Sequence, residues 1–226
     1  MLRAPPLRTH KNGVLDYIVS EDDYVENYEE ISLTYNPNVS LETQAILNCC
    51  DLIIDNLSND EYSVADIGCG AGFVINPIKI SPRNKVAVDI SLNQLNRVDP
   101  EITRIRANVE NLPIEDGVFD AVICTDIFEH VQNEKALVRE VSRVLRPGGT
   151  LLFACPWKQD LSVYDMPEYK AKFKQYKYLH LRSVDEDMIN DCFSEFKVVA
   201  STEITVAMSS MLFKPYAIRF FQFIKN

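Results

Sequence analysis

The chain has 226 residues, 46% of them hydrophobic, and a formal net charge of −10 at pH 7. This length suits one domain with a buried core, and the acidic charge argues against a general nucleic-acid-binding protein, which needs a basic face. The six cysteines show no CxxC spacing, as is typical of reduced thiols. The N-terminus lacks an apolar signal segment, and no window offers about 18 uninterrupted apolar residues. We therefore expect a cytoplasmic protein without a membrane span.

Hydrophobic patterns divide the chain into helices and strands in a regular order. Residues 41–57 repeat apolar side chains at helical spacing. From residue 62 onward, short apolar runs alternate with turn signals and helical patterns, which indicates a parallel α/β sheet. These runs are 62–67, 85–90, 102–107, 119–124 and 150–155.

Two further helices and a strand are predicted toward the C-terminus. One helix spans 134–145 and begins at Asn133, which is a good N-cap residue. The next begins with a capping box formed by Ser183 and Glu186. A strand is expected at about 196–206.

A glycine-rich turn follows the first apolar run. Asp66 stands at the end of that run, and glycines occupy positions 68, 70 and 72. Glycine lets the backbone pass close to a ligand and adopt dihedral angles that a Cβ forbids. The turn alone is weak evidence, but its GxGxG spacing argues against a dinucleotide dehydrogenase, which has GxGxxG.

Polar residues also stand at the ends of the next strands. Asp89 ends the second run, where doubly wound sheets place a carboxylate that binds a ribose diol. Ile90, beside it, can pack on an adenine face. Asn108 follows the third run, and its amide can both accept and donate at an adenine edge. Because the carboxyl ends of parallel strands share one edge of the sheet, we expect one site there for a ligand with adenine, ribose and a charged tail.

The motifs occur in a characteristic order over about residues 62–155. They are Asp-Ile-Gly-Cys-Gly-Ala-Gly, Val-Asp-Ile-Ser, Asn-Val-Glu-Asn-Leu-Pro, Phe-Asp-Ala-Val, Glu-His-Val and Leu-Arg-Pro-Gly-Gly-Thr-Leu. In this order they resemble the class I S-adenosylmethionine-dependent methyltransferases, and most closely the type 11 subgroup that modifies small molecules. The resemblance implies cofactor contacts from Asp66, Gly68, Cys69 and Gly70 at the methionine end, Asp89 at the ribose, Asn108 and Val109 at the adenine, and Thr125 near the sulfonium.

The chain departs from the pattern of that family in three respects. The family closes its sheet with an antiparallel hairpin, of which the sequence indicates only one strand, at about 196–206. Asn108 stands where the family usually has Asp, although an amide can still bind adenine. Pro77 and Pro82 interrupt the helix that normally follows the glycine turn. Since a proline inside a helix costs roughly 3 kcal/mol, we expect that helix to be short or displaced.

Three residues outside the cofactor motifs are candidate catalytic groups: His130, His180 and Glu129. If the acceptor is a hydroxyl, a base must take its proton, and any of the three can serve. A bound neutral amine needs positioning alone. A packing role for His130 is an equally good interpretation. We see no ligand cluster with metal-binding spacing, so no metal is predicted.

The connection over 157–182 is where this family usually builds its acceptor site. It carries more basic than acidic residues, although the whole chain has a net charge of −10. Such a segment suits an anionic acceptor, for example a phosphorylated or nucleotide-linked sugar or a carboxylate. A solvated helical face is the commoner meaning of a charge run. The aromatic, basic tail over 211–225 is open between a closing strand, a helix and a dimer contact, and membrane-surface contact is less favoured.

We therefore expect an α/β protein with a Rossmann-like, doubly wound, seven-stranded sheet, mostly parallel with an antiparallel C-terminal strand. A single domain would comprise a helical N-terminal cap (1–60), a cofactor-binding core (61–155), an acceptor-site insertion (156–183) and a C-terminal helix with closing strands and tail (184–226). The predicted activity of this monomer or homodimer is S-adenosylmethionine-dependent methyl transfer to an oxygen or nitrogen of a small molecule. RNA or protein methylation, and a non-catalytic cofactor-binding subunit, are the alternatives.

Overall fold

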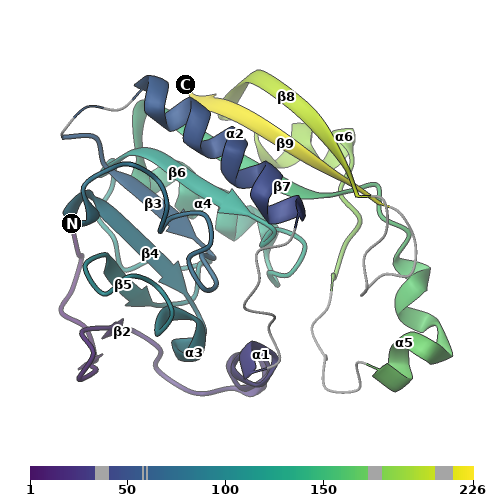
Figure 1. Ribbon diagram of the computed structural model, residues 1–226, viewed down its shortest axis with the longest axis horizontal. Helices are drawn as coiled ribbons and strands as arrows, with labels where there is room; N and C mark the ends of the chain where they lie inside the picture. The colour runs from purple at the N-terminus through teal and green to yellow at the C-terminus, as the bar shows by residue number, and fades with distance from the viewer. Residues whose placement is uncertain (34–40, 58, 60, 173–179, 207–215) are drawn as a thin grey trace.

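The computed structural model describes all residues except 34–40, 58, 60, 173–179 and 207–215. Its centre is a nine-stranded sheet with the order β1-β2-β5-β4-β3-β6-β7-β9-β8 (Figure 1). The strands are β1 (Arg8–Thr9), β2 (Leu15–Asp16), β3 (Val64–Ile67), β4 (Lys85–Asp89), β5 (Thr103–Arg106), β6 (Phe119–Thr125), β7 (Leu145–Trp157), β8 (Phe196–Val206) and β9 (Tyr216–Lys225).

The prediction of a mostly parallel sheet with antiparallel pairing at the C-terminus is confirmed. The strands from β2 to β7 pair in parallel, and β9 pairs antiparallel with both β7 and β8. The predicted number of seven strands is wrong. The short strands β1 and β2 extend the sheet beyond β5, and two residues are too few to produce a readable alternation of side chains.

Helices cover both faces of the sheet. They are α1 (Asp23–Leu33), α2 (Leu41–Leu57), α3 (Leu92–Leu95), α4 (Glu134–Val144), α5 (Pro167–Lys172) and α6 (Glu186–Cys192), with short 3-10 helices η1 (Pro82–Asn84) and η2 (Leu161–Asp165). On one face, α2 packs Ile46 and Ile54 into the same apolar cluster as Leu152 of β7. On the other, α4 and α6 pack against Phe153 and Phe221. The inner strands are therefore buried on both faces, as is usual in parallel sheets.

A helical cap formed by residues 1–60 is not what the structure has. Residues 8–16 contribute β1 and β2, and α2 is part of the layer on the sheet. Only α1 lies beyond the carboxyl ends of β3 and β4 (Figure 1). The amphipathic pattern of α2 is the same for a cap and for a sheet-covering helix, so the sequence could not distinguish them.

Helix caps follow the sequence in one case and not in the other. Asn133 accepts a hydrogen bond from the Ala136 N–H at the start of α4, as predicted. The predicted capping box of Ser183 is wrong, because Asp185 caps α6 and accepts from the Met188 N–H. The reason is that Val184 forms a parallel bridge with Trp157, which keeps the chain extended beyond Ser183.

Two other segments bear on the predictions. After the glycine turn the chain forms turns and η1 in place of an α-helix, and the buried Lys85 ammonium donates to the carbonyl oxygens of Ile75 and Asn76 (3.0 and 3.1 Å). The tail from Tyr216 forms β9, whose Phe220 and Phe223 are buried in the core, while residues 211–215 lie outside the described residues. Among the helices described, none has the length and apolar character needed to cross a bilayer.

Candidate active site

The glycine turn and the end of β4 are joined by hydrogen bonds at the carboxyl edge of the sheet. The backbone N–H groups of Gly68 and Cys69 donate to the Val88 carbonyl oxygen at 2.8 and 3.0 Å. The Gly70 N–H donates to Asp89 Oδ2 at 2.8 Å. Two motifs that the sequence placed at separate strand ends thus meet at one point, as parallel pairing of β3 and β4 requires.

The glycines of this turn serve different purposes. Gly68 has a φ of +80°, and a Cβ there would lie 2.7 Å from Cγ1 of Ile127, so this glycine allows close packing. Gly70 has a φ of +52°, and no atom lies within 4 Å of the position where its Cβ would be. The backbone of Gly70 therefore faces open space beside Asp89, which is a surface that a ligand can approach closely.

Asp89 is a hydrogen-bond acceptor at the edge of this space. Besides the Gly70 N–H, its carboxylate accepts the Ser91 N–H at 2.8 Å. Burial raises the pKa of Asp89, and these backbone donors oppose the rise. Two carboxylate oxygens have more lone pairs than these two donors use, so the group retains capacity to accept from a diol. Ile90, next to it, is half-buried.

Helix α1 is attached to the same edge by Glu29. The Glu29 carboxylate accepts from the N–H groups of Leu92 and Asn93 at 2.6 and 3.1 Å, at the start of α3. It also lies 3.0 Å from the Arg106 guanidinium, which in turn donates to the Ile90 carbonyl oxygen. The role of Glu29 is not visible in the sequence, because the acidic residues of a helix look alike until their distant partners are known.

Asp66, the carboxyl group of the glycine motif, has a strongly shifted pKa. Its side chain is 2% exposed, and burial together with the nearby Asp89 raises its pKa from 3.8 to about 8. At neutral pH the carboxyl group therefore holds its proton in the ligand-free protein. The ordinary acidity of aspartate returns only when the chain unfolds or when a cation lies beside it.

We expect Asp66 to make the ligand-free protein less stable as the pH rises. Its folded-state pKa of about 8 lies above the unfolded value of 3.8, so its contribution is complete below about pH 4 and is lost by about pH 8. Each pKa unit corresponds to about 1.4 kcal/mol. Urea unfolding of the wild type and Asp66→Asn across this range should show a difference of several kcal/mol that grows with pH. Parallel stability profiles would refute the shift.

The structure places the other predicted cofactor residues as follows. Asn108 is exposed, and its side-chain oxygen accepts the Glu110 N–H at 2.9 Å, which leaves its NH2 group and the second lone pair of the oxygen for a ligand. The Val109 side chain is buried in the core. Thr125 is half-buried at the end of β6. The Cys69 thiol is buried, and burial raises its pKa, as suits a residue that is not a nucleophile.

Glu129, His130 and His180 come together, although His180 is far from the other two in sequence. The Nε2 atoms of His130 and His180 lie 3.8 and 3.9 Å from Oε1 of Glu129, and the two imidazole rings meet edge to face at 4.7 Å. The Leu181 N–H donates to the Glu129 carbonyl oxygen at 2.8 Å, and Arg182 donates to the carbonyl oxygens of Phe128 and Val131. These bonds hold the segment after residue 179 against the turn that follows β6.

The electrostatics of this cluster favour neutral side chains. Burial and the nearby Asp126 raise the pKa of Glu129 well above its ordinary value. Burial and His130 lower the pKa of His180 well below 6.5. Tyr24 of α1, which the sequence analysis did not single out, donates from its hydroxyl to the His130 carbonyl oxygen at 3.3 Å.

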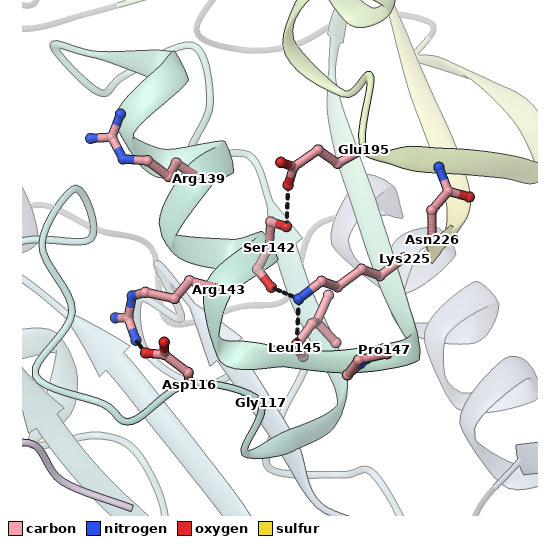
Figure 2. Close-up of a pocket in the computed structure, with 10 residues that line it drawn as sticks. All are labelled: Asp116, Gly117, Arg139, Ser142, Arg143, Leu145, Pro147, Glu195, Lys225 and Asn226. Atoms are coloured by element: carbon pink, nitrogen blue, oxygen red, sulfur yellow. Dashed lines mark hydrogen bonds and ion pairs between the residues drawn. The ribbon is translucent and has the colours of Figure 1, made fainter.

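A hollow of about 690 Å³ lies at the opposite edge of the sheet, away from the carboxyl ends of the strands, where α4 ends and β7 begins (Figure 2). There the Lys225 ammonium donates to the carbonyl oxygens of Ser142 and Leu145 at 2.7 and 2.9 Å, which joins the end of β9 to α4. None of the predicted site residues lines it. We attribute these contacts to the stability of the fold.

The doubly wound sheet, the glycine turn and the strand-end carboxylate together define a Rossmann-like α/β fold, a class of fold that binds ligands at the carboxyl edge of its sheet. Residues 65–153 match the family model described as a methyltransferase domain. This match agrees with the resemblance of the motifs to the class I S-adenosylmethionine-dependent methyltransferases, a class whose cofactor is S-adenosylmethionine.

Individual relatives agree with this assignment. The chain is 35% identical over 122 residues to the sarcosine/dimethylglycine N-methyltransferase of Halorhodospira halochloris. This alignment covers 50% of this chain and 42% of the relative. It is 35% identical over 103 residues to the ubiquinone biosynthesis O-methyltransferase of Xanthomonas campestris, covering 40% of this chain and 41% of the relative. The chain thus spans less than half the length of both enzymes.

A solved structure supports the fold. The magnesium protoporphyrin IX methyltransferase of Synechocystis, with S-adenosylhomocysteine bound, superposes with a TM-score of 0.61. It covers 89% of this chain and 93% of its own, at 14% sequence identity. This similarity concerns the fold alone.

Proposed function

We propose that this protein transfers the methyl group of S-adenosylmethionine to an oxygen or nitrogen atom of a small molecule. One observation carries the proposal. The open space at Gly70, beside Asp89, lies at the carboxyl end of one strand, and the Glu129–His130–His180 cluster lies at the carboxyl end of a neighbouring strand. Tyr28 of α1 lies near the cluster, because its ring meets the His130 ring edge to face with the centroids 6.1 Å apart. Burial, Tyr24 and the charges of Glu129 and Asp89 raise the pKa of its hydroxyl. Two reactants bound in these regions would lie side by side.

The residues at the edge fit the cofactor. The backbone of Gly70 leaves room for it, the Asp89 carboxylate can accept from its ribose diol, and the half-buried Ile90 can contact its adenine. We assign Asp66, Gly68 and Cys69 to the methionine end, Asn108 and Val109 to the adenine, and Thr125 to the neighbourhood of the sulfonium. When bound, S-adenosylmethionine supplies an electrophilic methyl group on its sulfonium. The chain contributes alignment and exclusion of water, which can supply most of the rate acceleration.

The acceptor belongs on the side of the Glu129–His130–His180 cluster. A hydroxyl acceptor must lose its proton, and this cluster is the group of titratable side chains placed to assist. An amine that binds in its neutral form needs positioning alone. The names of the two relatives include an N-methyltransferase and an O-methyltransferase, so both acceptor atoms remain within the proposal. An anionic acceptor rests on the basic composition of the segment over 156–183 alone, because Lys158, Lys170 and Arg182 pair with carboxylates of the protein.

A methyl-transfer assay tests the proposal. The purified chain would be incubated with methyl-labelled S-adenosylmethionine and, separately, with amino acids, phenols, hydroxy acids, nucleotide-linked sugars, total RNA and total protein. We expect label in one of the small-molecule fractions, with the methyl position identified by mass spectrometry. Label in RNA or protein alone would replace the small-molecule acceptor by a macromolecule. Cofactor binding without transfer to any fraction would favour the non-catalytic subunit.

A further inference from the structure

The side chains of Glu129, His130 and His180 offer three ligand atoms around one point. One ligand atom from each residue lies within 4.8 Å of the others. Two atoms bound to one zinc ion at about 2.1 Å lie roughly 3.4 Å apart in tetrahedral geometry and never more than about 4.2 Å apart. The two imidazole Nε2 atoms lie 3.8 and 3.9 Å from Glu129 Oε1, and both spacings fall within this range. The whole set spans up to 4.8 Å, so the side chains would draw together slightly on binding an ion.

A second observation concerns the other oxygen of Glu129. The side chain is 1% exposed, and its Oε2 atom has no hydrogen-bond partner among the residues that the structure describes. A buried carboxylate oxygen without a partner is destabilising and calls for an explanation. A bound cation would give this oxygen a partner. Packing alone does not explain why the oxygen is buried without one.

The surroundings of His180 resemble the outer shell of a metal site. Its Nδ1 atom is hydrogen-bonded to the side-chain oxygen of Gln159, which requires Nδ1 to carry the proton. The lone pair of His180 therefore lies on Nε2, the atom that faces Glu129. Metal-ligating histidines generally donate their other ring N–H to a carbonyl or carboxylate oxygen in this way. Gln159 is itself buried, so the orientation of the ring is well defined.

We infer that Glu129, His130 and His180 bind one divalent transition-metal ion of the zinc type. Two imidazoles and one carboxylate favour such an ion over Mg²⁺ or Ca²⁺, which prefer oxygen ligands throughout. Three protein ligands leave at least one coordination position open, as in catalytic zinc sites. The sequence did not reveal this set, because His180 reaches the other two only through the contacts of Leu181 and Arg182 with the turn after β6.

The role of the ion in the reaction rests on the proposed function, whereas the site itself does not. An acceptor hydroxyl bound at the open position would lose its proton more readily, since a metal lowers the pKa of bound water to about 7. The O–H bond breaks, the oxygen keeps the electron pair, and the proton passes to solvent water. In this state the imidazoles act as ligands, and neither serves as the base.

The test is a titration of Co²⁺ into tag-free protein that has been treated with a chelator. We expect one equivalent to bind, with the visible absorption of Co²⁺ held by imidazole and carboxylate, and Zn²⁺ to displace it. Glu129→Gln and His180→Asn should each weaken binding by more than about 100-fold, and Gln159→Ala by 10–100-fold, the usual effect of an outer-shell partner. His10→Asn, which alters the histidine outside the cluster, should leave it unchanged.

Calorimetric titration of S-adenosylhomocysteine into the same metal-free samples separates the two proposals. Folded wild type that binds S-adenosylhomocysteine but gives no Co²⁺ spectrum overturns the metal site alone. The metal site is also overturned if Glu129→Gln or His180→Asn, and Gln159→Ala as well, bind Co²⁺ as tightly as the wild type does. Failure to bind S-adenosylhomocysteine, with or without Co²⁺ binding, counts against the proposed methyl transfer.

Discussion

Replacement of Asp89 by alanine should weaken the binding of S-adenosylhomocysteine by about 100-fold. The variant loses the carboxylate that we assign to the ribose diol, and a hydrogen bond to a charged group contributes about 1.5–3 kcal/mol. Calorimetric titration measures the effect directly. Asp89→Asn keeps one accepting oxygen, so its loss should be about tenfold.

Folding must be controlled in this series, because Asp89 also accepts from the backbone of Gly70 and Ser91. Asp191→Ala is a matched control: this carboxylate is exposed and pairs with Lys135 on the surface of α6. We expect its affinity to equal that of the wild type. An Asp89→Ala variant that is folded and binds S-adenosylhomocysteine as tightly as Asp191→Ala would contradict the assignment of the ribose site.

Gly70→Ala should weaken cofactor binding substantially with only a modest loss of stability. The new methyl group would enter the open space at Gly70, where no protein atom lies within 4 Å. If the cofactor occupies that space, the overlap costs about 1–3 kcal/mol, or roughly 10–100-fold in affinity. The left-handed backbone of Gly70, with a φ of +52°, adds a folding cost of about 1–2 kcal/mol.

Gly148→Ala separates these two effects. Gly148 also has a positive φ of +73° and nothing within 4 Å of its Cβ position, but it lies at the start of β7, away from the carboxyl edge. Thermal unfolding should show similar losses of stability for the two variants. Calorimetric titration should show a weaker affinity for S-adenosylhomocysteine in Gly70→Ala only. Equal affinities in both would mean that the cofactor does not approach Gly70.

The cofactor side of the site could be predicted because its residues stand at strand ends. Parallel pairing of β3 and β4 is enough to bring the glycine turn to Asp89, and the apolar runs already indicated that pairing. The prolines after the turn predicted a short or displaced helix, and the structure has turns and the short 3-10 helix η1 in its place. Local patterns and one rule of sheet topology were sufficient here.

The remaining features depend on contacts that local patterns do not encode. The short β1 and β2 form only because β5 offers a free edge, and α2 lies on the sheet because its apolar side matches the core. His180 joins Glu129 through hydrogen bonds made by its neighbours in sequence. The three candidate catalytic residues therefore stay a prediction from the sequence, while their proximity, on which the proposed metal site rests, comes from the structure.

A crystal structure of the chain with S-adenosylhomocysteine tests the central claim most directly. The account predicts the ribose diol on the Asp89 carboxylate, the backbone of Gly70 against the ligand, and the sulfur toward the Glu129–His130–His180 cluster. Density for the ligand at any other edge of the sheet would contradict the account, as would a complex in which Asp89 makes no contact with it.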